Sequence, residues 1–219
     1  MLHYFQELLQ ALDVGSLLDA LLRVAAVLLC LTVHETCHGL AAYLLGDPTA
    51  KRMRRLSFNP LRHIDWFGLA MMFFAGFGWA KPVPVDDRYF KKPKLGMALT
   101  ALAGPVSNLL LAVLMIFLSK LIYLYSPYYV WVDELFSFLL YVAAPLSVGL
   151  GLFNLIPIPP LDGSKLFAAF LPDRAYEKLM RYERYGILVL LALSYFGVMS
   201  NFISDAIVFV YTFLLNLIY

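Results

Sequence analysis

Charged residues are scarce in this sequence. Of its 219 residues only 15% are Asp, Glu, Lys or Arg, whereas 62% are hydrophobic and the mean hydropathy is +0.75. Soluble domains contain about a quarter charged residues and about half apolar residues, so this composition excludes an ordinary water-soluble protein. The small net charge of +2 gives no indication of nucleic-acid binding.

Cysteine is also rare, because only Cys30 and Cys37 occur. On one predicted helix their spacing places the two Cα atoms about 10 Å apart. A disulfide requires a Cα separation below about 7 Å, so we predict no disulfide bond. The first 16 residues also lack the basic segment that opens a secretory signal peptide. We therefore expect the first hydrophobic run to stay in the membrane.

Long hydrophobic runs are abundant, and they predict an all-α polytopic membrane protein with about five to six transmembrane helices. The predicted spans are 17–45, 97–125, 135–155 and one or two segments within 186–219.

Shorter stretches between these runs predict membrane-associated elements. Residues 1–16 are predicted to form an interfacial helix, and the apolar stretch 67–80 is short enough to be re-entrant or interfacial. Two further stretches, 53–58 and 82–86, are predicted as short β segments.

The distribution of basic residues predicts the orientation. Most of the 17 Lys and Arg residues lie in three segments, whereas the loop 126–134 has none; the basic segments are 47–66, 81–96 and 163–185. Because cytoplasmic loops are enriched in Lys and Arg, these segments are predicted to be cytoplasmic. Their side chains are expected to contact anionic lipid of the bilayer.

Two histidines and a glutamate interrupt the first hydrophobic run, which reads LLCLTVHETCHGLAAYLLG over 28–46. A charged residue in hydrocarbon costs about 2.5–3.5 kcal/mol, so this cluster needs a reason. His34 and His38 are four residues apart and therefore share one face of a helix. Two imidazoles at this spacing can bind one zinc ion, and Glu35 can act as general base on a metal-bound water. The alternative is that neighbouring helices simply satisfy these polar groups.

A catalytic zinc ion usually has three protein ligands and one open position. Asp162 is the better candidate for the third ligand, because it follows a predicted span in the same leaflet, in the segment PIPPLDG. Pro157 and its neighbouring prolines exclude helix there, and Gly163 permits a tight turn. The alternative is an ordinary Asp-Gly turn at a helix end. His63 is interpreted as interfacial or as a neighbour of the ligands, and Asn154 as a structural residue that orients the turn.

Taken together, HETCH and the NLIPIPPLDG segment resemble the site-2 protease family of intramembrane zinc metalloproteases. GFGWAKPVPVD at 76–86 and AGPVSN at 103–108 resemble the family as well. The resemblance implies that His34, His38 and Asp162 bind one zinc ion per chain and that Glu35 is the catalytic base. It also suggests that Asn108 faces the active site, where its amide could bond the substrate or an oxyanion. A helix-packing role for Asn108 is the alternative.

We expect an integral membrane enzyme in the cell membrane, and the distribution of basic residues places its active site in the cytoplasmic half. It would hydrolyse a peptide bond within or near the transmembrane segment of a membrane-protein substrate. We expect one membrane-embedded domain over 1–219, in a minimal form without an appended regulatory domain. Its catalytic core would be 17–171, followed by a cytoplasmic stretch and spans over 172–219. Two alternatives remain, an intramembrane metal transporter and an inactive relative that binds membrane segments.

Overall fold

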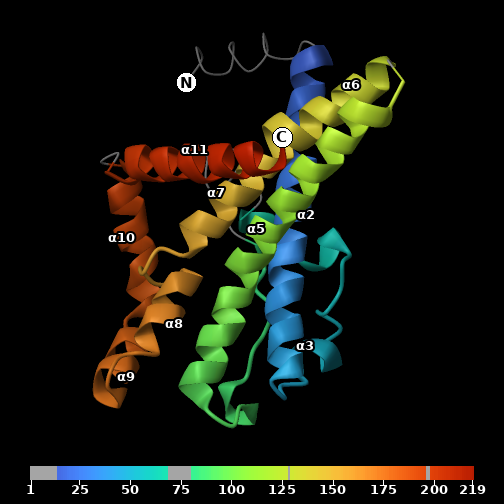
Figure 1. Ribbon diagram of the computed structural model, residues 1–219. Coiled ribbons are helices and arrows are strands. Elements are labelled where there is room, and N and C mark those ends of the chain that lie inside the picture. The colour runs from blue at the N-terminus through green and yellow to red at the C-terminus, as the bar shows by residue number, and fades with distance from the viewer. Residues whose placement is uncertain (1–13, 69–79, 128, 196–197) are drawn as a thin grey trace.

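The computed structural model describes residues 14–68, 80–127, 129–195 and 198–219. The described residues form helices joined by turns and irregular segments, and they contain no strand. The prediction of an all-α protein is therefore confirmed for this part of the chain. Figure 1 shows two long helices crossing at the centre, with the C-terminal helices along one side.

Helices α2 (Val14–Leu44) and α5 (Pro93–Tyr125) form the centre of the fold and pack along each other. A third long helix is built from α6 (Val130–Ser137), the π-helical turn η3 (Phe138–Ala143) and α7 (Ala144–Asn154). Helix α5 contacts α2, α7 and α8, so it is the axis of the bundle.

Small side chains bring these helices close together. The core contains fully buried residues with little or no side chain bulk, namely Ala26, Cys30, Ala112, Ala143 and Ala144. In a membrane the lipid tails are as apolar as the core, so close packing between small residues stabilises helix association. Both cysteines are free, as the sequence predicted.

Three helices in the described residues are long and apolar enough to cross a membrane, namely Asp19–Leu44, Pro93–Tyr125 and Val130–Asn154. They correspond to the predicted spans 17–45, 97–125 and 135–155. The total of five to six spans is not reached by this measure, because the apolar part of the last helix, Phe202–Ile218, is shorter. Further spans therefore remain a prediction.

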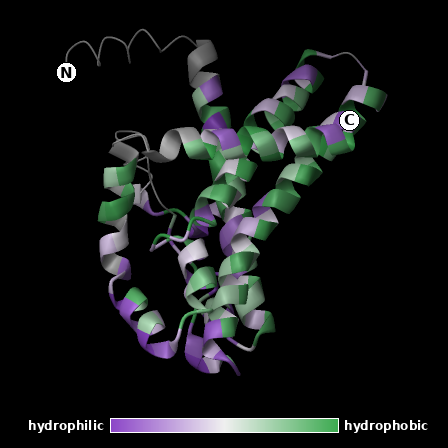
Figure 2. Cartoon of the chain, turned by 60° about the vertical axis from the view of Figure 1, so that its left-hand side comes forward, coloured by the Kyte–Doolittle hydropathy of each residue, from purple (hydrophilic) through white to green (hydrophobic). Residues whose placement is uncertain are grey.

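The described residues that follow α7 form four helices. They are α8 (Asp162–Ala168), α9 (Asp173–Arg181), α10 (Glu183–Tyr195) and α11 (Val198–Ile218). Helix α11 lies across α7 and contacts it. Hydrophilic residues gather at the end of the molecule that carries α9 (Figure 2).

The connection between α2 and α5 contains only short elements. They are α3 (Thr49–Arg52), η1 (Pro60–Arg62) and η2 (Asp87–Tyr89). Most of the predicted re-entrant stretch 67–80 and most of the predicted interfacial helix 1–16 lie outside the described residues. Residues 14–16 already belong to α2.

The prediction of β segments at 53–58 and 82–86 is wrong, because both are irregular. Pro82 and Pro84 have no N–H to donate to a β ladder. The N–H groups of Val83 and Asp86 are bound instead by the carboxylates of Glu35 and Asp47. The segment is therefore held by side chains of other elements and not by a partner strand.

Candidate metal centre

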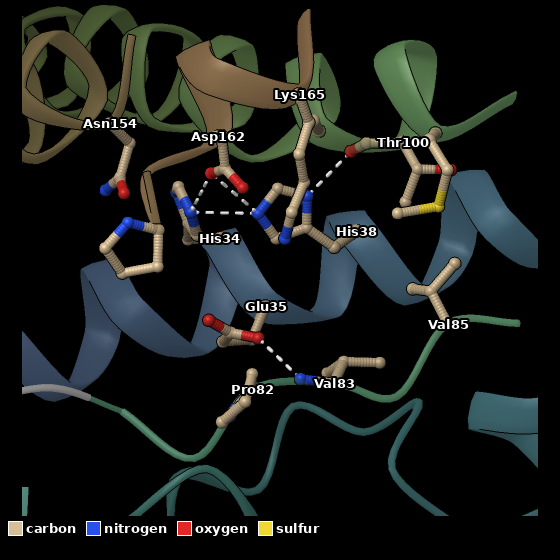
Figure 3. A pocket seen from close by; sticks show the side chains of 13 residues that line it. His34, Glu35, His38, Pro82, Val83, Val85, Thr100, Asn154, Asp162 and Lys165 are labelled. Carbon is tan, nitrogen blue, oxygen red and sulfur yellow. Dashed lines mark hydrogen bonds and ion pairs between the residues drawn. The ribbon is translucent and has the colours of Figure 1, made fainter. Parts of the chain in front are cut away.

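His34 and His38 lie on one face of α2, as their spacing requires. Their ring centroids are 4.5 Å apart and the ring planes are nearly perpendicular, at 88°. Both residues are buried, with 3% and 8% of their surface exposed. Figure 3 shows both rings directed towards α8 and α5, on the opposite side of α2 from the segment that carries Val83.

Asp162 reaches the histidines from the first residue of α8. The irregular segment after α7 contains three prolines, which prevent α7 from continuing. Gly163 permits the sharp return, because a Cβ atom there would lie 2.1 Å from the carbonyl oxygen of Leu155. The first turn of α8 therefore rests directly on the backbone at the end of α7, which explains why the sequence has glycine at this position.

Three potential ligand atoms form a small triangle. The Nε2 atoms of His34 and His38 lie 3.0 Å apart, and each is 3.0 Å from Oδ2 of Asp162. In the described part of the chain these three residues form the one group of His, Cys, Asp and Glu with metal-site geometry.

The hydrogen bonding of His38 sets its tautomer. Its Nδ1 lies 2.7 Å from the carbonyl oxygen of Thr100, which can only accept, so Nδ1 carries the hydrogen. The Nε2 atom then presents a lone pair to the triangle, which is the arrangement of a metal-binding histidine. Tetrahedral ligands at about 2.0–2.1 Å from zinc would lie about 3.3 Å apart. The residues present thus fit a zinc ion after a slight outward movement.

The backbone of α5 lies directly against the rings of His34 and His38 at Gly104. A Cβ atom at Gly104 would lie 2.4 Å from Nε2 of His38 and 2.6 Å from Cε1 of His34. No residue with a side chain fits there unless the rings move. The glycine of the AGPVSN motif therefore defines how closely α5 approaches the ligands.

Glu35 shares a cavity of about 270 Å³ with the three ligands. It leaves α2 in a different direction from the histidines, towards the segment 82–85 (Figure 3). Its Oε2 accepts a hydrogen bond of 2.8 Å from the backbone N–H of Val83. Glu35 is partly exposed, so the carboxylate can meet a molecule that enters the cavity.

Side chains on the basic loop hold the segment that binds Glu35. Arg55 donates to the carbonyl oxygens of Lys81 and Pro82, at 2.8 and 3.3 Å. Farther along, Arg88 donates to the carboxylate of Asp86 and lowers the pKa of that group. The Arg55 contacts hold the segment against the basic loop without a β ladder.

The remaining predicted residues lie around the centre. Asn154 lines the cavity, and its amide donates to the Leu150 carbonyl, one turn earlier in α7. Pro157 lines a separate apolar cavity. His63 is buried and donates to the Ser57 carbonyl at 2.7 Å, so it holds its own loop.

Asn108 is fully buried in α5, near α7. Its backbone carbonyl accepts a hydrogen bond from Ser147, and its side-chain amide has no partner among the described residues. It is not one of the residues that line the cavity of the metal centre. Its proposed contact with substrate therefore stays a prediction.

The sequence did not point to four residues that border or support the candidate metal centre, namely Thr100, Gly104, Val83 and Lys165. Two of them act through backbone atoms, which leave no signature in residue type. Gly104 lies within a motif that carried the family resemblance, but its contact with the histidines depends on how α5 packs. Lys165 lies three residues after Asp162, a spacing that shares one helix face and could have been noticed.

Comparisons with known proteins show which family the chain belongs to. The model of peptidase family M50 matches residues 118–197, which include Asp162. A protein of Bacillus subtilis (strain 168) named "Putative zinc metalloprotease YwhC" is 41% identical over 175 residues, which cover 78% of this chain and 78% of that protein.

More distant relatives carry a similar name. Two proteins named "Putative zinc metalloprotease Rip2" match, from Mycolicibacterium smegmatis (strain ATCC 700084 / mc(2)155) and Mycobacterium tuberculosis (strain ATCC 25618 / H37Rv). They are 27% and 28% identical over 178 and 176 residues, which cover 79% and 78% of this chain and 66% and 65% of those proteins. No solved structure matches the chain at a significant level. The chain therefore belongs to peptidase family M50, the site-2 protease family, and is a metalloprotease.

Proposed function

We propose that this protease hydrolyses a peptide bond within or near the transmembrane segment of a membrane-protein substrate. One observation carries the proposal. The ligand atoms of His34, His38 and Asp162 converge at 3.0 Å beside Glu35, in one cavity bordered by long apolar helices. A polar centre of this kind in a membrane-spanning helix serves a reaction within the bilayer, since it is otherwise costly.

His34, His38 and Asp162 would hold the zinc ion. When bound, zinc supplies a Lewis acid and lowers the pKa of water towards neutrality. Glu35 receives a proton from the attacking water and later delivers it to the leaving amide nitrogen. One carboxylate oxygen of Glu35 is oriented by the Val83 N–H, which leaves the other oxygen to exchange the proton.

The molecule belongs in a membrane because three of its helices are long and apolar enough to span one. We place it in the cell membrane as one domain over 1–219, with the active site in the cytoplasmic half. The concentration of basic residues in 47–66, 81–96 and 163–185 supports this orientation. The bilayer and a transmembrane substrate are the partners.

The two alternative functions make different demands on the molecule. A metal transporter needs a succession of polar sites along a pathway, whereas the described residues contain a single group with metal-site geometry. An inactive relative would need no general base, yet Glu35 lies in the same cavity as the ligands. Neither alternative gains support from a specific contact.

The test combines metal analysis with cleavage. We would purify the wild type, Glu35→Gln and the matched control Glu134→Gln, which changes an exposed residue of α6. Each protein would be assayed for zinc and incubated with a panel of single-span substrates. We expect equal zinc in all three, with cleavage only by the wild type and the control, abolished by a chelator.

Two results would contradict the proposal. A well-folded wild type without zinc would exclude the metal centre. Cleavage by Glu35→Gln at the wild-type rate would exclude Glu35 as the base.

A further inference from the structure

Lys165 places a positive charge at the cavity of the metal centre. It lies on α8, three residues after Asp162, so both side chains project from the same face of that helix. Lys165 lines the cavity together with Glu35 and the ligands, and its side chain is 26% exposed. Figure 3 shows this side chain extending from α8 towards α2. Neither zinc binding by the three ligands nor proton transfer by Glu35 requires a lysine at this position.

Several other hydrogen-bond donors at the cavity are engaged or buried. One N–H of the Asn154 amide donates to the Leu150 carbonyl, and the N–H of Val83 donates to Glu35. The hydroxyl of Thr100 is buried and neutral. Among the described residues that line the cavity, Lys165 is the one Lys or Arg.

The ammonium of Lys165 is only loosely held by the protein. Its Nζ atom lies 3.6 Å from a carboxylate oxygen of Glu183, at the start of α10, and both side chains are partly exposed. Partly exposed ion pairs of this kind contribute little to stability. The ammonium is therefore free to turn towards a bound molecule.

We propose that Lys165 binds the carbonyl oxygen of the scissile peptide bond and stabilises the negative charge that develops there. This inference rests on the proposed function. Water attacks the carbonyl carbon, the carbonyl π electrons move to the oxygen, and one water proton moves to Glu35. Lys165 donates a hydrogen bond to that oxygen and keeps its own proton. When the C–N bond breaks, its electron pair leaves with the nitrogen, which takes the proton from Glu35, and the carbonyl re-forms.

The positions of Glu35 and Lys165 allow each residue to act on a different reacting group. Glu35 and Lys165 reach the cavity from different elements, α2 and α8, so one can act on the water while the other acts on the carbonyl oxygen. A donor aimed at the developing charge acts most strongly where water is excluded, and loss of one such donor costs about 100- to 1,000-fold in rate.

The experiment compares Lys165→Met, Lys165→Arg and Glu183→Gln with the wild type. Methionine keeps much of the length of lysine but has no charge and no donor. We expect Lys165→Met to keep its zinc while kcat for a single-span substrate falls about 100-fold with little change in KM. Lys165→Arg should recover part of the loss, because arginine keeps the charge with different geometry. Glu183→Gln removes only the ion pair and should stay within about threefold of the wild type.

A second measurement does not depend on turnover. Two inhibitors with the same side chains would be compared, a phosphinic peptide with an anionic tetrahedral group and a hydroxyethylene peptide with a neutral alcohol. We expect Lys165→Met to weaken binding of the phosphinic peptide by about 100-fold, with binding of the alcohol nearly unchanged. Only a role in binding negative charge produces this difference.

The inference is overturned if Lys165→Met weakens both inhibitors equally or loses zinc, because Lys165 would then be structural. It is also overturned if Glu183→Gln loses as much activity as Lys165→Met, since the ion pair would then be the important contact. A wild type that binds zinc but cleaves no substrate would contradict the proposed function, and the inhibitor pair would still decide the role of Lys165. A zinc-free wild type would overturn both proposals.

Discussion

Two faces of α2 contribute to the active centre, and they are supported in different ways. The face with His34 and His38 packs against α5 and α8, where Gly104 leaves just enough room for the rings. The face with Glu35 meets irregular chain, where the N–H of Val83 binds the carboxylate. One helix thus presents the proposed metal ligands to regular, close-packed structure and the proposed general base to a segment without regular structure.

This difference indicates what each group requires. Metal ligands must keep distances within a few tenths of an ångström, and contact between helix backbones provides that rigidity. A general base needs a set direction and access to water and substrate. Hydrogen bonds from an extended segment provide direction without filling the cavity. Changes on the ligand face should therefore affect zinc, whereas changes on the Glu35 face should affect turnover alone.

The largest effect is expected from Gly104→Ala, on the ligand face. The new methyl carbon would lie 2.4 Å from Nε2 of His38, so the ring must move away from the triangle. We expect zinc affinity to fall about 100-fold and cleavage to fall with it. Zinc content at equilibrium with a metal buffer measures the change. Ala favours helix over Gly by about 1 kcal/mol, so a loss cannot come from helix propensity.

Gly149→Ala is the matched control for this glycine. Its new Cβ would lie 3.0 Å from Cδ1 of Ile207, the end of a flexible side chain. We expect full zinc binding and activity. Normal zinc affinity in Gly104→Ala would show that the close approach of α5 does not position the ligands.

A smaller effect is expected from Arg55→Met, which acts on the Glu35 face. Arg55 donates to the carbonyls of Lys81 and Pro82, next to the residue that binds Glu35. Without these bonds the segment that carries Val83 should lose its fixed position. We expect cleavage to fall about tenfold at constant zinc content. Arg52→Met is the control, since the Arg52 guanidinium donates to the Tyr89 hydroxyl, at 3.3 Å, and not to the backbone next to Val83. Zinc loss in Arg55→Met would mean that the two faces are not independent.

Gly39→Ala tests the Glu35 face of α2 with a smaller structural change. Its new Cβ would lie 3.1 Å from Cγ1 of Val83, so Val83 must shift by a few tenths of an ångström. We expect zinc to remain bound and kcat to fall about two- to threefold, because the hydrogen bond to Glu35 lengthens slightly. Steady-state kinetics would measure this, and a loss of zinc like that of Gly104→Ala would argue against the comparison.

The smallest effect is expected from Arg88→Gln, at the far end of the same segment. The Arg88 side chain lowers the pKa of Asp86, so its removal should raise that pKa towards the ordinary value. A lowered pKa stabilises the folded state above the ordinary value, and this contribution is lost as pH falls through the folded-state pKa. NMR titration of the Asp86 carboxyl would detect the change. Cleavage at neutral pH should be unaffected, because Asp86 is charged in both proteins.

Local rules explain why much of this protein could be predicted. The periodicity of a helix places His34 and His38 on one face whatever surrounds them, and the prolines before Asp162 must end α7. Hydrophobic runs predicted the three long helices because bilayer thickness relates length to span. The wrong prediction of β segments has a local cause too. The stretches 53–58 and 82–86 were interpreted as strand-like, but strand formation needs a partner, which sequence alone does not provide.

By itself, the sequence determined the residue types of the centre, their order along the chain and the helices that carry them, because these depend on neighbours a few residues apart. Only the tertiary structure decided that Asp162, from a distant helix, reaches both histidines at 3.0 Å. It also decided that Gly104 supports them and that Val83 orients Glu35. Those contacts depend on how closely helices far apart in the chain can pack, and packing is set by the shapes of all the side chains between them.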